Sequence, residues 1–517
     1  MREKIIFAAL MTERRVRVRF APSPTGPLHI GGVRTALYNY LFARKNGGDF
    51  VLRIEDTDQS RYVAGAEEYI FDTLKWCGLE PDESVQHGGE YGPYRQSERK
   101  ASYLQYAERL VKDGYAYYAF DTSSELEKMR NDFKSEQNHT PQYDLHTRLK
   151  MRNSLSLTEE EVNKLLADKT PYVIRIKMPE QETISFNDMI RGEVHFDSSL
   201  VDDKVLLKAD GMPTYHLAVV VDDYQMKISH AFRGEEWLPS APVHILLWKY
   251  LFGIENMPQW AHFPLILGPN GKLSKRDGSK YGFPVFAMNW MDPKTNELTE
   301  GFKEKGFIPQ GFINLLALLG WNDGTEKEIF SLEELIEKFS MERVHSAGAH
   351  FDYDKAKWYN QEWIKQLSIA DFRLQIEKGF LPENHDESKL DKIIPLVKDR
   401  CTLLTDFTEQ SSFFFKAPET LDTDSVKPKW NDAKQLFFVE LIRNYELTLQ
   451  WDATTLESNF KEIASVNGLK PGELMLPFRI MLVGGKFGPG VFDIADVLGK
   501  EETISRIKKA LDIFSAK

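Results

Sequence analysis

The most constraining feature of this sequence is an alternating segment that leads directly into a proline- and glycine-rich loop and then a helix. From Arg15 to Phe20, arginines alternate with valine and phenylalanine, which predicts a β-strand. The loop from Ala21 to Gly32 follows, and apolar residues then recur at helical spacing from Val33 to Leu41. Phe50 to Ile54 is typical of a buried parallel strand. This βαβ unit is expected to open a doubly wound parallel sheet.

The α/β character continues over roughly the first 320 residues. Apolar positions from Ala66 to Cys77 share one helical face, and Gly78 is placed to end that helix. Residues 101 to 200 indicate a mixed insertion, with a strand near Val173 to Lys177. The sheet is expected to resume with a strand at Tyr215 to Val221 and another at Phe263 to Leu267.

After about residue 320 the pattern changes to helices alone. Apolar residues lie on one helical face in each of the segments 332–339, 390–404 and 504–514. No fixed-period repeat or low-complexity tract interrupts them. An α/β nucleotide-binding half followed by an all-helical half is therefore the predicted organisation.

Composition excludes several classes of protein. Of 517 residues, 42% are hydrophobic and 28% charged, which is ordinary for a soluble globular chain and excludes wholesale disorder and collagen-like repeats. Nothing approaches the roughly 18 to 20 apolar residues of a membrane-spanning helix. With 66 basic and 78 acidic residues, the formal charge is −12, which taken alone argues against a nucleic-acid partner. Net charge is an average, however, whereas binding is local.

The cysteines and the N-terminus both indicate a protein of a reducing compartment. Cys77 and Cys401 are the two cysteines, far apart in sequence, so a disulfide framework is poorly supported. The short apolar run at residues 5–11 resembles a signal sequence, but charged residues follow it without a cleavage pattern. We expect no secretion; alternatively, translation starts at Met11 rather than Met1.

Two loops carry the residue types of a phosphate site. His29, Gly31 and Gly32 lie where a helix begins after a strand, so backbone N–H groups and the helix dipole favour an anion there. The loop Lys272–Arg276 has three cations between Gly268 and Gly278, and could close over a triphosphate and stabilise a leaving pyrophosphate. Taken singly, the first could be an ordinary turn and the second a solvated surface loop.

These loops resemble motifs of a known family. Pro22–Gly32 resembles the HIGH motif of class I aminoacyl-tRNA synthetases, and Lys272–Arg276 resembles their KMSKS motif. Further segments resemble the bacterial glutamyl-tRNA synthetase branch, in that family's order: Arg19–Gly26, Arg53–Asp58, Gly92–Arg99, Pro213–His216 and Arg233–Glu236. The resemblance extends from about residue 15 to the C-terminus.

The resemblance implies a Rossmann-type doubly wound catalytic domain with an α+β insertion, followed by an all-helical anticodon-binding half. Glutaminyl enzymes of the same subclass carry β-barrels in that place, which the helical periodicities argue against. The implied domains are 15–100 and 206–265 (catalytic), 101–205 (acceptor-binding insertion), 266–350 (KMSKS loop and stem-contact domain) and 351–517 (anticodon-binding domain).

The implied reaction joins glutamate to tRNA(Glu) in two steps, with ATP and Mg²⁺. The glutamate carboxylate attacks the α-phosphorus of ATP, and the tRNA terminal adenosine then takes the glutamyl group on its 2′ hydroxyl. No side chain is needed as a nucleophile, so His29, Lys272 and Lys275 are expected to act by positioning and charge stabilisation. Activation is expected to wait for bound tRNA. The ATP-binding residues implied are Pro22, Thr25, Gly26, His29, Gly31, Gly32, Ser274 and Lys275.

Glutamate has two carboxylates and one ammonium to be recognised. Arg19 and Arg233 are guanidinium forks suited to the carboxylates, with Tyr215 as a further partner; either arginine could take the side-chain carboxylate, and we favour Arg19. Glu55 is expected to bind the ammonium. Residues expected to help it are Ala21 and Ser23. An alternative is that Arg53 and Asp56 pair structurally and that Glu55 belongs to this pairing.

Two further expectations concern a metal and the anticodon. Some relatives hold zinc through cysteines in the insertion, where this chain has Ala119, Phe120, Asp121 and Thr147, so we expect no zinc. Arg400 corresponds to an arginine that contacts the third anticodon base; alternatively it is a surface arginine. A monomer in the cytoplasm, without membrane contact, is the family's norm.

Other functions remain open at this point. A glutaminyl enzyme would share the catalytic motifs, and a relative that modifies a tRNA base or a non-catalytic regulatory paralogue would lack the C-terminal module or motif residues, neither of which is missing. Whether tRNA(Gln) is also charged is open. The acidic average is compatible with tRNA if basic residues cluster on the tRNA-facing side. The expected clusters are Arg14, Arg15, Arg17 and Arg19, and Lys272, Lys275 and Arg276.

Overall fold

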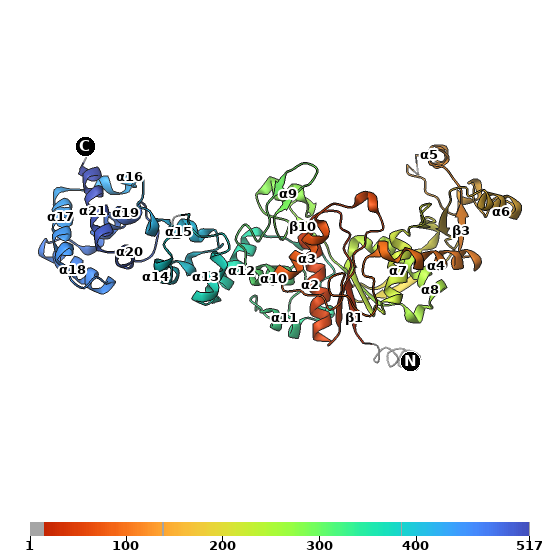
Figure 1. Cartoon of the computed structure of the whole chain (residues 1–517), viewed down its shortest axis with the longest axis horizontal. Coiled ribbons are helices and arrows are strands. Elements are labelled where there is room, and N and C mark those ends of the chain that lie inside the picture. Colours follow the sequence, from red (N-terminus) through yellow and green to blue (C-terminus); the bar gives the residue numbers. More distant parts are fainter. Residues whose placement is uncertain (1–14, 137–138, 384, 516–517) are drawn as a thin grey trace. The chain divides into compact units, whose positions relative to one another are not determined.

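The computed structural model describes residues 15–136, 139–383 and 385–515 (Figure 1). The N-terminal apolar run, Arg14 and both candidate start positions lie outside these ranges. The chain forms two compact units. Unit 1 extends to Phe302 and includes Ile313–Asp352, whereas unit 2 comprises Lys303–Phe312 and the chain from Tyr353 onward. No helix in the described ranges is long and apolar enough to span a membrane.

Unit 1 is built on a six-stranded sheet in the order β2-β1-β8-β9-β5-β6. Its neighbours pair in parallel except for the antiparallel β5–β6 hairpin. This confirms the doubly wound sheet expected from the opening βαβ unit. The strands are β1 (Arg17–Phe20), β2 (Asp49–Leu52), β5 (Thr183–Asp188), β6 (Gly192–Asp197), β8 (His230–Gly234) and β9 (Gln259–Phe263).

The first helices follow the spacing of the sequence. Helix α2 (Ile30–Lys45) buries Val33, Leu37 and Leu41. The positive charges of its two C-terminal basic residues interact favourably with the negative end of the helix dipole. Helix α3 (Ala66–Trp76) is followed by Gly78, whose φ of 70° lies in the left-handed region that glycine adopts without strain. Both predicted helices are therefore confirmed.

The strand expected at Tyr215 to Val221 is wrong. These residues form helix α7 (Tyr215–Gln225), which packs against α4 (Lys100–Lys112) and α8 (Ala241–Leu251). Leu217 to Val221 are all buried, so the run is apolar on every side of the helix. Periodicity cannot separate a buried helix from a buried strand in such a run.

The strand expected at Phe263 to Leu267 is divided between two sheets. Strand β9 ends at Phe263, and β10 (Ile266–Gly268) begins a separate sheet with β11 (Gly271–Lys272) and β14 (Ala349–His350). Pro264, between them, has no backbone N–H to continue the ladder. The segment therefore turns from the main sheet toward the second predicted phosphate loop.

The α+β insertion is confirmed. Its antiparallel sheet orders β3 (Ala116–Ala119), β4 (Val173–Ile176) and β7 (Val205–Leu207), so the strand expected near Val173 is β4. Helices α5 (Ser123–Asp132) and α6 (Glu159–Ala167) each begin with a capping box. The β5–β6 hairpin lies within this stretch of sequence but joins the main sheet, where Asp188 pairs with Trp260.

The last part of unit 1 carries short helices. Helix α9 (Lys275–Tyr281) follows β11, and α11 (Leu332–Lys338) confirms the helix expected at 332–339. Helix α10 (Pro309–Leu318) begins among the residues of unit 2 and ends in unit 1. A two-stranded hairpin, β12 (Trp290–Met291) with β13 (Leu298–Thr299), lies between α9 and α10 in the sequence.

Within its described residues, unit 2 is entirely helical, as expected, and the β-barrel alternative is excluded there. The helix expected to continue to Leu404 ends at Val397, but Cys401 and Leu404 remain buried in the same core. The helices are α12 (Tyr353–Gln366), α13 (Ile369–Ile376), α14 (Glu387–Val397), α15 (Asp406–Phe415), α16 (Thr423–Val426), α17 (Asp432–Leu447), α18 (Ala453–Val466), α19 (Pro471–Val483), α20 (Val491–Leu498) and α21 (Lys500–Ser515).

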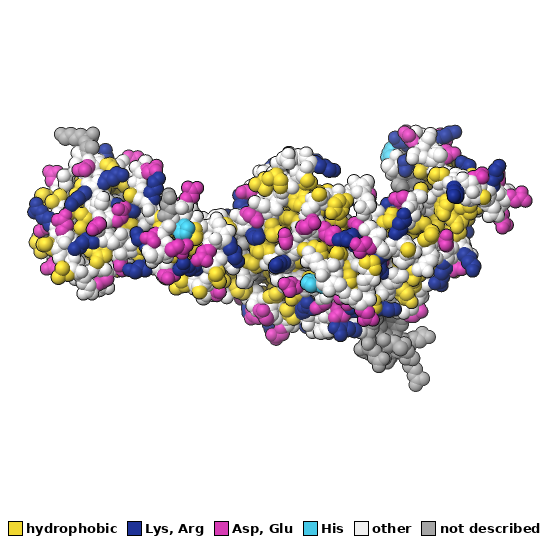
Figure 2. Space-filling view, viewed as in Figure 1, with side chains coloured by type: hydrophobic (Ala, Val, Ile, Leu, Met, Phe, Trp, Pro, Cys, Tyr) yellow, Lys and Arg dark blue, Asp and Glu magenta, His cyan; other side chains and the backbone are white. Residues whose placement is uncertain are grey.

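The arginines of β1 correct the expected basic cluster. Arg17 is buried and donates to Asp49 and Glu83, at 2.8 Å each, and Arg19 is buried against Asp223. Parallel strands covered on both faces have no solvent side, so alternation did not place these arginines outward. Of the described members of this cluster, only Arg15 is exposed, and it is paired with Asp49. Figure 2 shows charges of both signs interspersed on the visible face.

Candidate functional site

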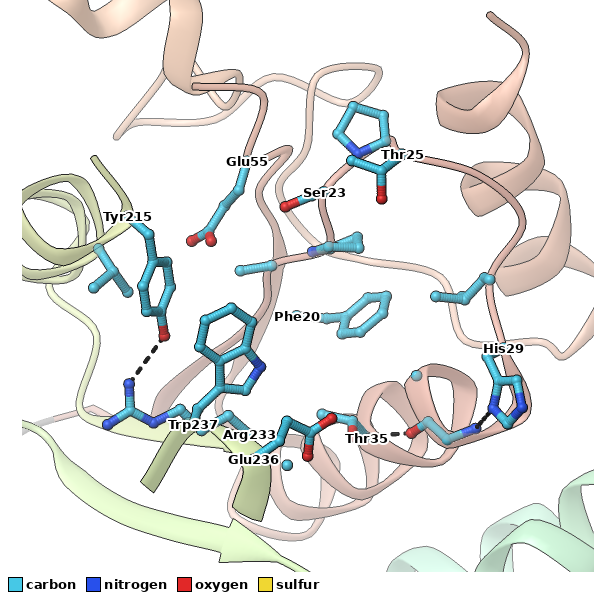
Figure 3. A pocket seen from close by; sticks show the side chains of 18 of the residues that line it. Phe20, Ser23, Thr25, His29, Thr35, Glu55, Tyr215, Arg233, Glu236 and Trp237 are labelled. Atoms are coloured by element: carbon cyan, nitrogen blue, oxygen red, sulfur yellow. Dashed lines mark hydrogen bonds between the residues drawn. The ribbon is translucent and has the colours of Figure 1, made fainter. Parts of the chain in front are cut away.

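A cavity of about 640 Å³ opens at the carboxyl ends of β1 and β8. Crevices at this edge of an open α/β sheet are the usual place for ligands. Figure 3 shows Glu55, Tyr215 and Arg233 toward one end of the cavity and His29 at the other. The predicted residues that line it are Arg19, Ala21, Pro22, Ser23, Thr25, His29, Gly31, Gly32, Glu55, Tyr215, Arg233 and Lys272. Gly26, Ser274, Lys275 and Arg400 do not line it.

His29 caps the N-terminus of α2 and is held in one tautomer. Its Nδ1 accepts the backbone N–H of Gly31 at 3.2 Å, so the ring hydrogen lies on Nε2. Nε2 is buried and has no hydrogen-bond partner among the described residues. Burial, and secondarily the charge of Lys272, lowers the pKa of His29 to about 4. A neutral N–H donor thus remains unsatisfied at a helix N-terminus, which suits an anionic oxygen.

Gly32 allows the backbone at the start of α2 to pack closely against the side chain of Leu28. A Cβ at this position would lie 2.6 Å from Cδ1 of Leu28. Gly26, earlier in the loop, has a φ of 144°, which side chains rarely adopt. The loop's glycines therefore serve its shape, and Gly26 does so without lining the cavity.

The second loop brings one lysine to the cavity. Lys272 lines it and donates to Glu236 at 3.1 Å. Ser274, in contrast, donates from its backbone N–H and its hydroxyl to Asp277, at 2.9 and 2.6 Å, and thereby starts helix α9. Lys275 is the first residue of that helix. This loop therefore joins a cationic contact to a short capped helix.

A buried ion cluster lies behind the end of the cavity that Glu55 lines. Arg53, fully buried, donates to Oε1 of Glu55 at 2.9 Å and to Asp223 at 2.8 Å. Arg19 donates to the same aspartate at 3.0 Å. Burial raises the pKa of Glu55, and the two arginines oppose this rise. Asp222, 3.9 Å from Nε of Arg53, and its partner Arg99 extend this cluster to three cations and three anions, so the buried charges balance.

Of the alternative structural pairing, the contact between Arg53 and Glu55 is present, whereas a contact between Arg53 and Asp56 is not among those of the described residues. Glu55 does pair with Arg53, but Asp56 does not share in that pairing: it accepts the backbone N–H of Ser97 at 2.8 Å and the side chain of Gln59 at 3.0 Å. Glu55 therefore has a structural partner and also lines the cavity.

Arg233 is the second of the two arginines predicted to bind the amino acid, and it also lines the cavity. Its Nη1 donates to the hydroxyl of Tyr215 at 3.1 Å (Figure 3). Burial raises the pKa of Tyr215, so the phenol is neutral and can accept this bond. The ring of Trp237 lies 4.4 Å from that of Tyr215, centroid to centroid, and is 42% exposed.

Among the cavity residues to which the sequence assigns no role are Glu236, Trp237 and Lys208. Glu236 and Trp237 belong to or follow the Arg233–Glu236 segment, and their adjacency to a predicted carboxylate ligand is the signal that could have found them. Lys208, which donates to the carbonyl of Thr57 at 2.9 Å, stands alone in its loop and gives no such signal.

Arg400 lies in unit 2, in a 3-10 helix over Lys398–Arg400, and is exposed. Arg479 is close enough that the charge of Arg400, after the larger effect of burial, lowers its pKa. Arg479 donates to the carbonyls of Phe487, Gly488 and Pro489 at 3.1, 3.1 and 2.6 Å. Arg479 therefore lies beside the loop that carries Phe487, a residue that is 43% exposed.

The described residues offer no resident metal site, since no group of three or more histidine, cysteine or acidic side chains is suitably placed. Asp121, at the position where a zinc cysteine was considered, accepts from Arg152 and from Tyr143. Cys77 and Cys401 are free and buried, and burial raises the pKa of both thiols.

Family models match both parts of the chain. The model described as tRNA synthetases class I (E and Q), catalytic domain, matches residues 15–358, and an anticodon binding domain model matches residues 355–511. Glutamate–tRNA ligases of Christiangramia forsetii and Flavobacterium johnsoniae are each 50% identical to the chain, over 504 and 506 residues. Each alignment covers 96% of this chain and 99% of the relative.

Solved structures give the same result. A glutamate tRNA ligase from Elizabethkingia meningosepticum, in complex with its amino acid, matches with a TM-score of 0.92 and 48% identity, covering 97% of this chain and 100% of that one. The glutamate-tRNA synthetase of Elizabethkingia anophelis matches with a TM-score of 0.91 and 49% identity, covering 96% and 100%. The similarity thus includes both units.

Proposed function

Since the chain belongs to the class I tRNA synthetases of the glutamate and glutamine branch, we propose that it ligates L-glutamate to tRNA(Glu). The α-carboxylate of glutamate attacks the α-phosphorus of ATP, which gives glutamyl-adenylate and releases pyrophosphate. The 2′ hydroxyl of the tRNA terminal adenosine then takes the glutamyl group and releases AMP. The observation that carries this proposal is the cavity that Glu55, Tyr215 and Arg233 line toward one end and that His29, at the N-terminus of α2, lines at the other.

The amino-acid end of the cavity suits a dicarboxylate with one ammonium. Arg19 and Arg233 supply one guanidinium for each of the two carboxylates, and we assign the side-chain carboxylate to Arg19. Arg53 donates to Oε1 of Glu55, which leaves Oε2 available to accept from the ammonium. Ala21, Ser23 and Tyr215 complete this end.

The other end of the cavity suits a triphosphate, bound with its magnesium as substrate. The Nε2–H of His29 and the N-terminus of α2 face developing negative charge, and Lys272 adds a cation. Lys275 lies outside the lining, so its proposed role requires the loop to move when ATP binds. Unchanged turnover in Lys275→Ala would remove that role.

Unit 2 is proposed to bind the anticodon, with Arg400 at the third anticodon base. The supporting observations are the matching family model, the exposure of Arg400, and the exposed Phe487 beside Arg479, because a ring and cations together suit an unstacked base. The remaining domain roles are proposed as expected from the sequence: residues 101–205 for the acceptor end and 266–350 for stem contact.

One assay tests the proposed function most directly. The purified chain is given ATP and either glutamate or glutamine, with purified tRNA(Glu) or tRNA(Gln). We expect glutamate on tRNA(Glu); glutamine as the transferred amino acid would contradict the proposal, and charging of tRNA(Gln) with glutamate would show a non-discriminating enzyme. ATP–pyrophosphate exchange should require tRNA, and full exchange without it would contradict that expectation. We propose that the enzyme acts as a cytoplasmic monomer, which size-exclusion chromatography with light scattering tests for the oligomeric state.

A further inference from the structure

Behind the cavity, Arg233 contacts two buried histidines from different elements. Its Nε donates to Nε2 of His262 on β9 at 3.0 Å, and its Nη1 lies 3.1 Å from Nδ1 of His244 on α8. A guanidinium has only donors, so both of these imidazole nitrogens must be acceptors. An imidazolium has no acceptor, and both rings are therefore neutral.

The second nitrogen of each ring is also engaged, which fixes its tautomer. Nδ1 of His262 carries the hydrogen and donates to Oδ2 of Asp188 at 2.6 Å. Nε2 of His244 carries the hydrogen and faces Nδ1 of His216 at 3.2 Å. Asp188 is itself oriented, because its Oδ1 accepts the backbone N–H groups of Ile190 and Arg191 at 3.0 and 3.1 Å.

Burial agrees with neutral rings. His262, His244 and Asp188 are exposed by only 0%, 1% and 1%. Burial lowers the pKa of His262 to about 4 and that of His244 well below its ordinary value. The hydrogen bond from His262 also lowers the pKa of Asp188, against the effect of its burial. None of the three residues lines the cavity.

A count of the guanidinium donors shows what remains for a ligand. Nε is used by His262, and Nη1 is used by His244 and the hydroxyl of Tyr215. Nη2 is buried and has no hydrogen-bond partner within the described structure. The face of Arg233 is also covered by the ring of Trp260, 4.7 Å from Cζ. One nitrogen, with two hydrogens, is therefore uncommitted.

We propose that Asp188, His262 and His244 are positioning residues that hold Arg233 so that Nη2 is left to bind a carboxylate of glutamate. This inference rests on the proposed function, because it takes Arg233 as a ligand of the amino acid. The arginine is ordered before the substrate arrives, so little side-chain freedom is lost on binding. The residues act through Arg233 and do not touch substrate.

The test uses Asp188→Asn, which changes one atom. Oδ1 is held by two backbone N–H groups, so the asparagine carbonyl takes that place and its NH₂ faces Nδ1 of His262. That nitrogen must then accept, the hydrogen moves to Nε2, and a donor opposes the Nε–H of Arg233. We expect the KM for glutamate to rise about 10- to 100-fold, as when other supporting hydrogen-bond partners are removed, with a smaller change in the KM for ATP.

A matched control separates positioning from stability. Asp203 is fully buried in unit 1, accepts from Tyr117 and the backbone of Met178, and does not line the cavity. Asp203→Asn should lower stability but leave the KM for glutamate unchanged. If Asp188→Asn instead raises both KM values alike or changes neither, the positioning role is overturned.

A second pair of variants keeps the inference testable if Asp188→Asn does not fold. His244→Gln retains an acceptor for Arg233 and should keep the KM for glutamate, whereas His244→Leu should raise it. Equal KM values for this pair would overturn the role of His244.

A readout independent of activity distinguishes failure of this inference from failure of the proposed function. ¹⁵N NMR of histidine-labelled full chain should show hydrogen on Nδ1 of His262 in the native protein and on Nε2 in Asp188→Asn. A native Nε2–H tautomer would overturn the inference even if glutamate is charged. Absence of glutamate charging with the expected tautomers would instead refute the proposed function.

Discussion

At the scale of single residues, Lys272 offers a test of charge stabilisation. Its side chain is 58% exposed, so Lys272→Ala should not affect folding. Loss of a cation beside the leaving pyrophosphate should lower the rate of adenylate formation about 100- to 1,000-fold, as removal of other transition-state donors does. ATP–pyrophosphate exchange with tRNA present measures this. Lys75→Ala, near the exposed C-terminal end of α3, is the control, and an equal loss in both variants would contradict the assignment.

Residues of the site were predictable where they belong to local motifs. His29, Arg19 and Arg233 were each singled out from short segments, and all three line one cavity. The partners of Arg233 were not predictable, because Asp188 and His262 are distant from it in sequence and meet it only when β5, β8 and β9 pair. A histidine or aspartate alone in a strand gives no pattern that separates it from other buried polar residues.

At the scale of elements, the type of an element was predicted wrongly in a wholly apolar run, whereas an amphipathic run gave an error only in where a helix ends. Helix α3 has one polar face, so spacing identified it. Helix α7 is apolar over Leu217–Val221 because neighbours cover it, and a strand was predicted instead. The spacing of apolar residues also predicts that α14 continues to Leu404; Cys401 and Leu404 are indeed buried, but the helix ends at Val397, since buried apolar residues at this spacing do not require helical backbone.

Helix α9 depends on one carboxylate at its start. Asp277 accepts from the backbone N–H and hydroxyl of Ser274, so Asp277→Ala should fray the helix and speed amide hydrogen exchange over Lys275–Tyr281. The formation of glutamyl-adenylate should slow as well. Glu161→Ala is the matched control, since Glu161 makes the same two bonds to Thr158 in α6. In Glu161→Ala, amide hydrogen exchange should become faster in α6 alone, and activity should not fall. Equal losses of activity in the two variants would refute the link between the capping of α9 and activity.

At the scale of the whole molecule, stability should decrease in mild acid. Burial lowers the pKa of His29, His216 and His262 to about 4, so the unfolded chain binds protons from about pH 6.5 downward while the folded chain does not. The free energy of unfolding is therefore highest above about pH 6.5 and falls between about pH 6.5 and 4. His262, fully buried, contributes on the order of 3 kcal/mol to this fall.

Urea unfolding of unit 1 at several pH values between about 7.5 and 5 checks this expectation. In His262→Gln the free energy of unfolding should depend less steeply on pH, because glutamine takes up no proton. His385, on the surface of unit 2, has a raised pKa through bonds to Pro382 and Glu387, so it acts in the opposite direction. A urea midpoint that does not change with pH in this window would contradict the prediction.

The acidic average of the chain does not determine its behaviour toward tRNA. The net charge is −12, and Arg17 and Arg19 are neutralised within the fold, which leaves fewer basic residues for binding than the sequence suggests. Affinity for tRNA should still fall as salt rises, with a linear dependence of log K on log salt. Filter binding across ionic strength measures the slope, and a flat response would contradict an electrostatic interface.

The order in which the units occur along the chain bears on their biosynthesis. Lys303–Phe312 belongs to unit 2, where Ile308 is buried and bonded to Asn360, and the carbonyl of Gly306 accepts from Leu404. During translation this segment leaves the ribosome before its partners beyond Tyr353 have been made. Ile308 therefore has no core to pack into while the synthesis of Ile313–Asp352 completes unit 1. A nascent chain halted near residue 352 would expose it, and so would any protein cut there to isolate the catalytic half.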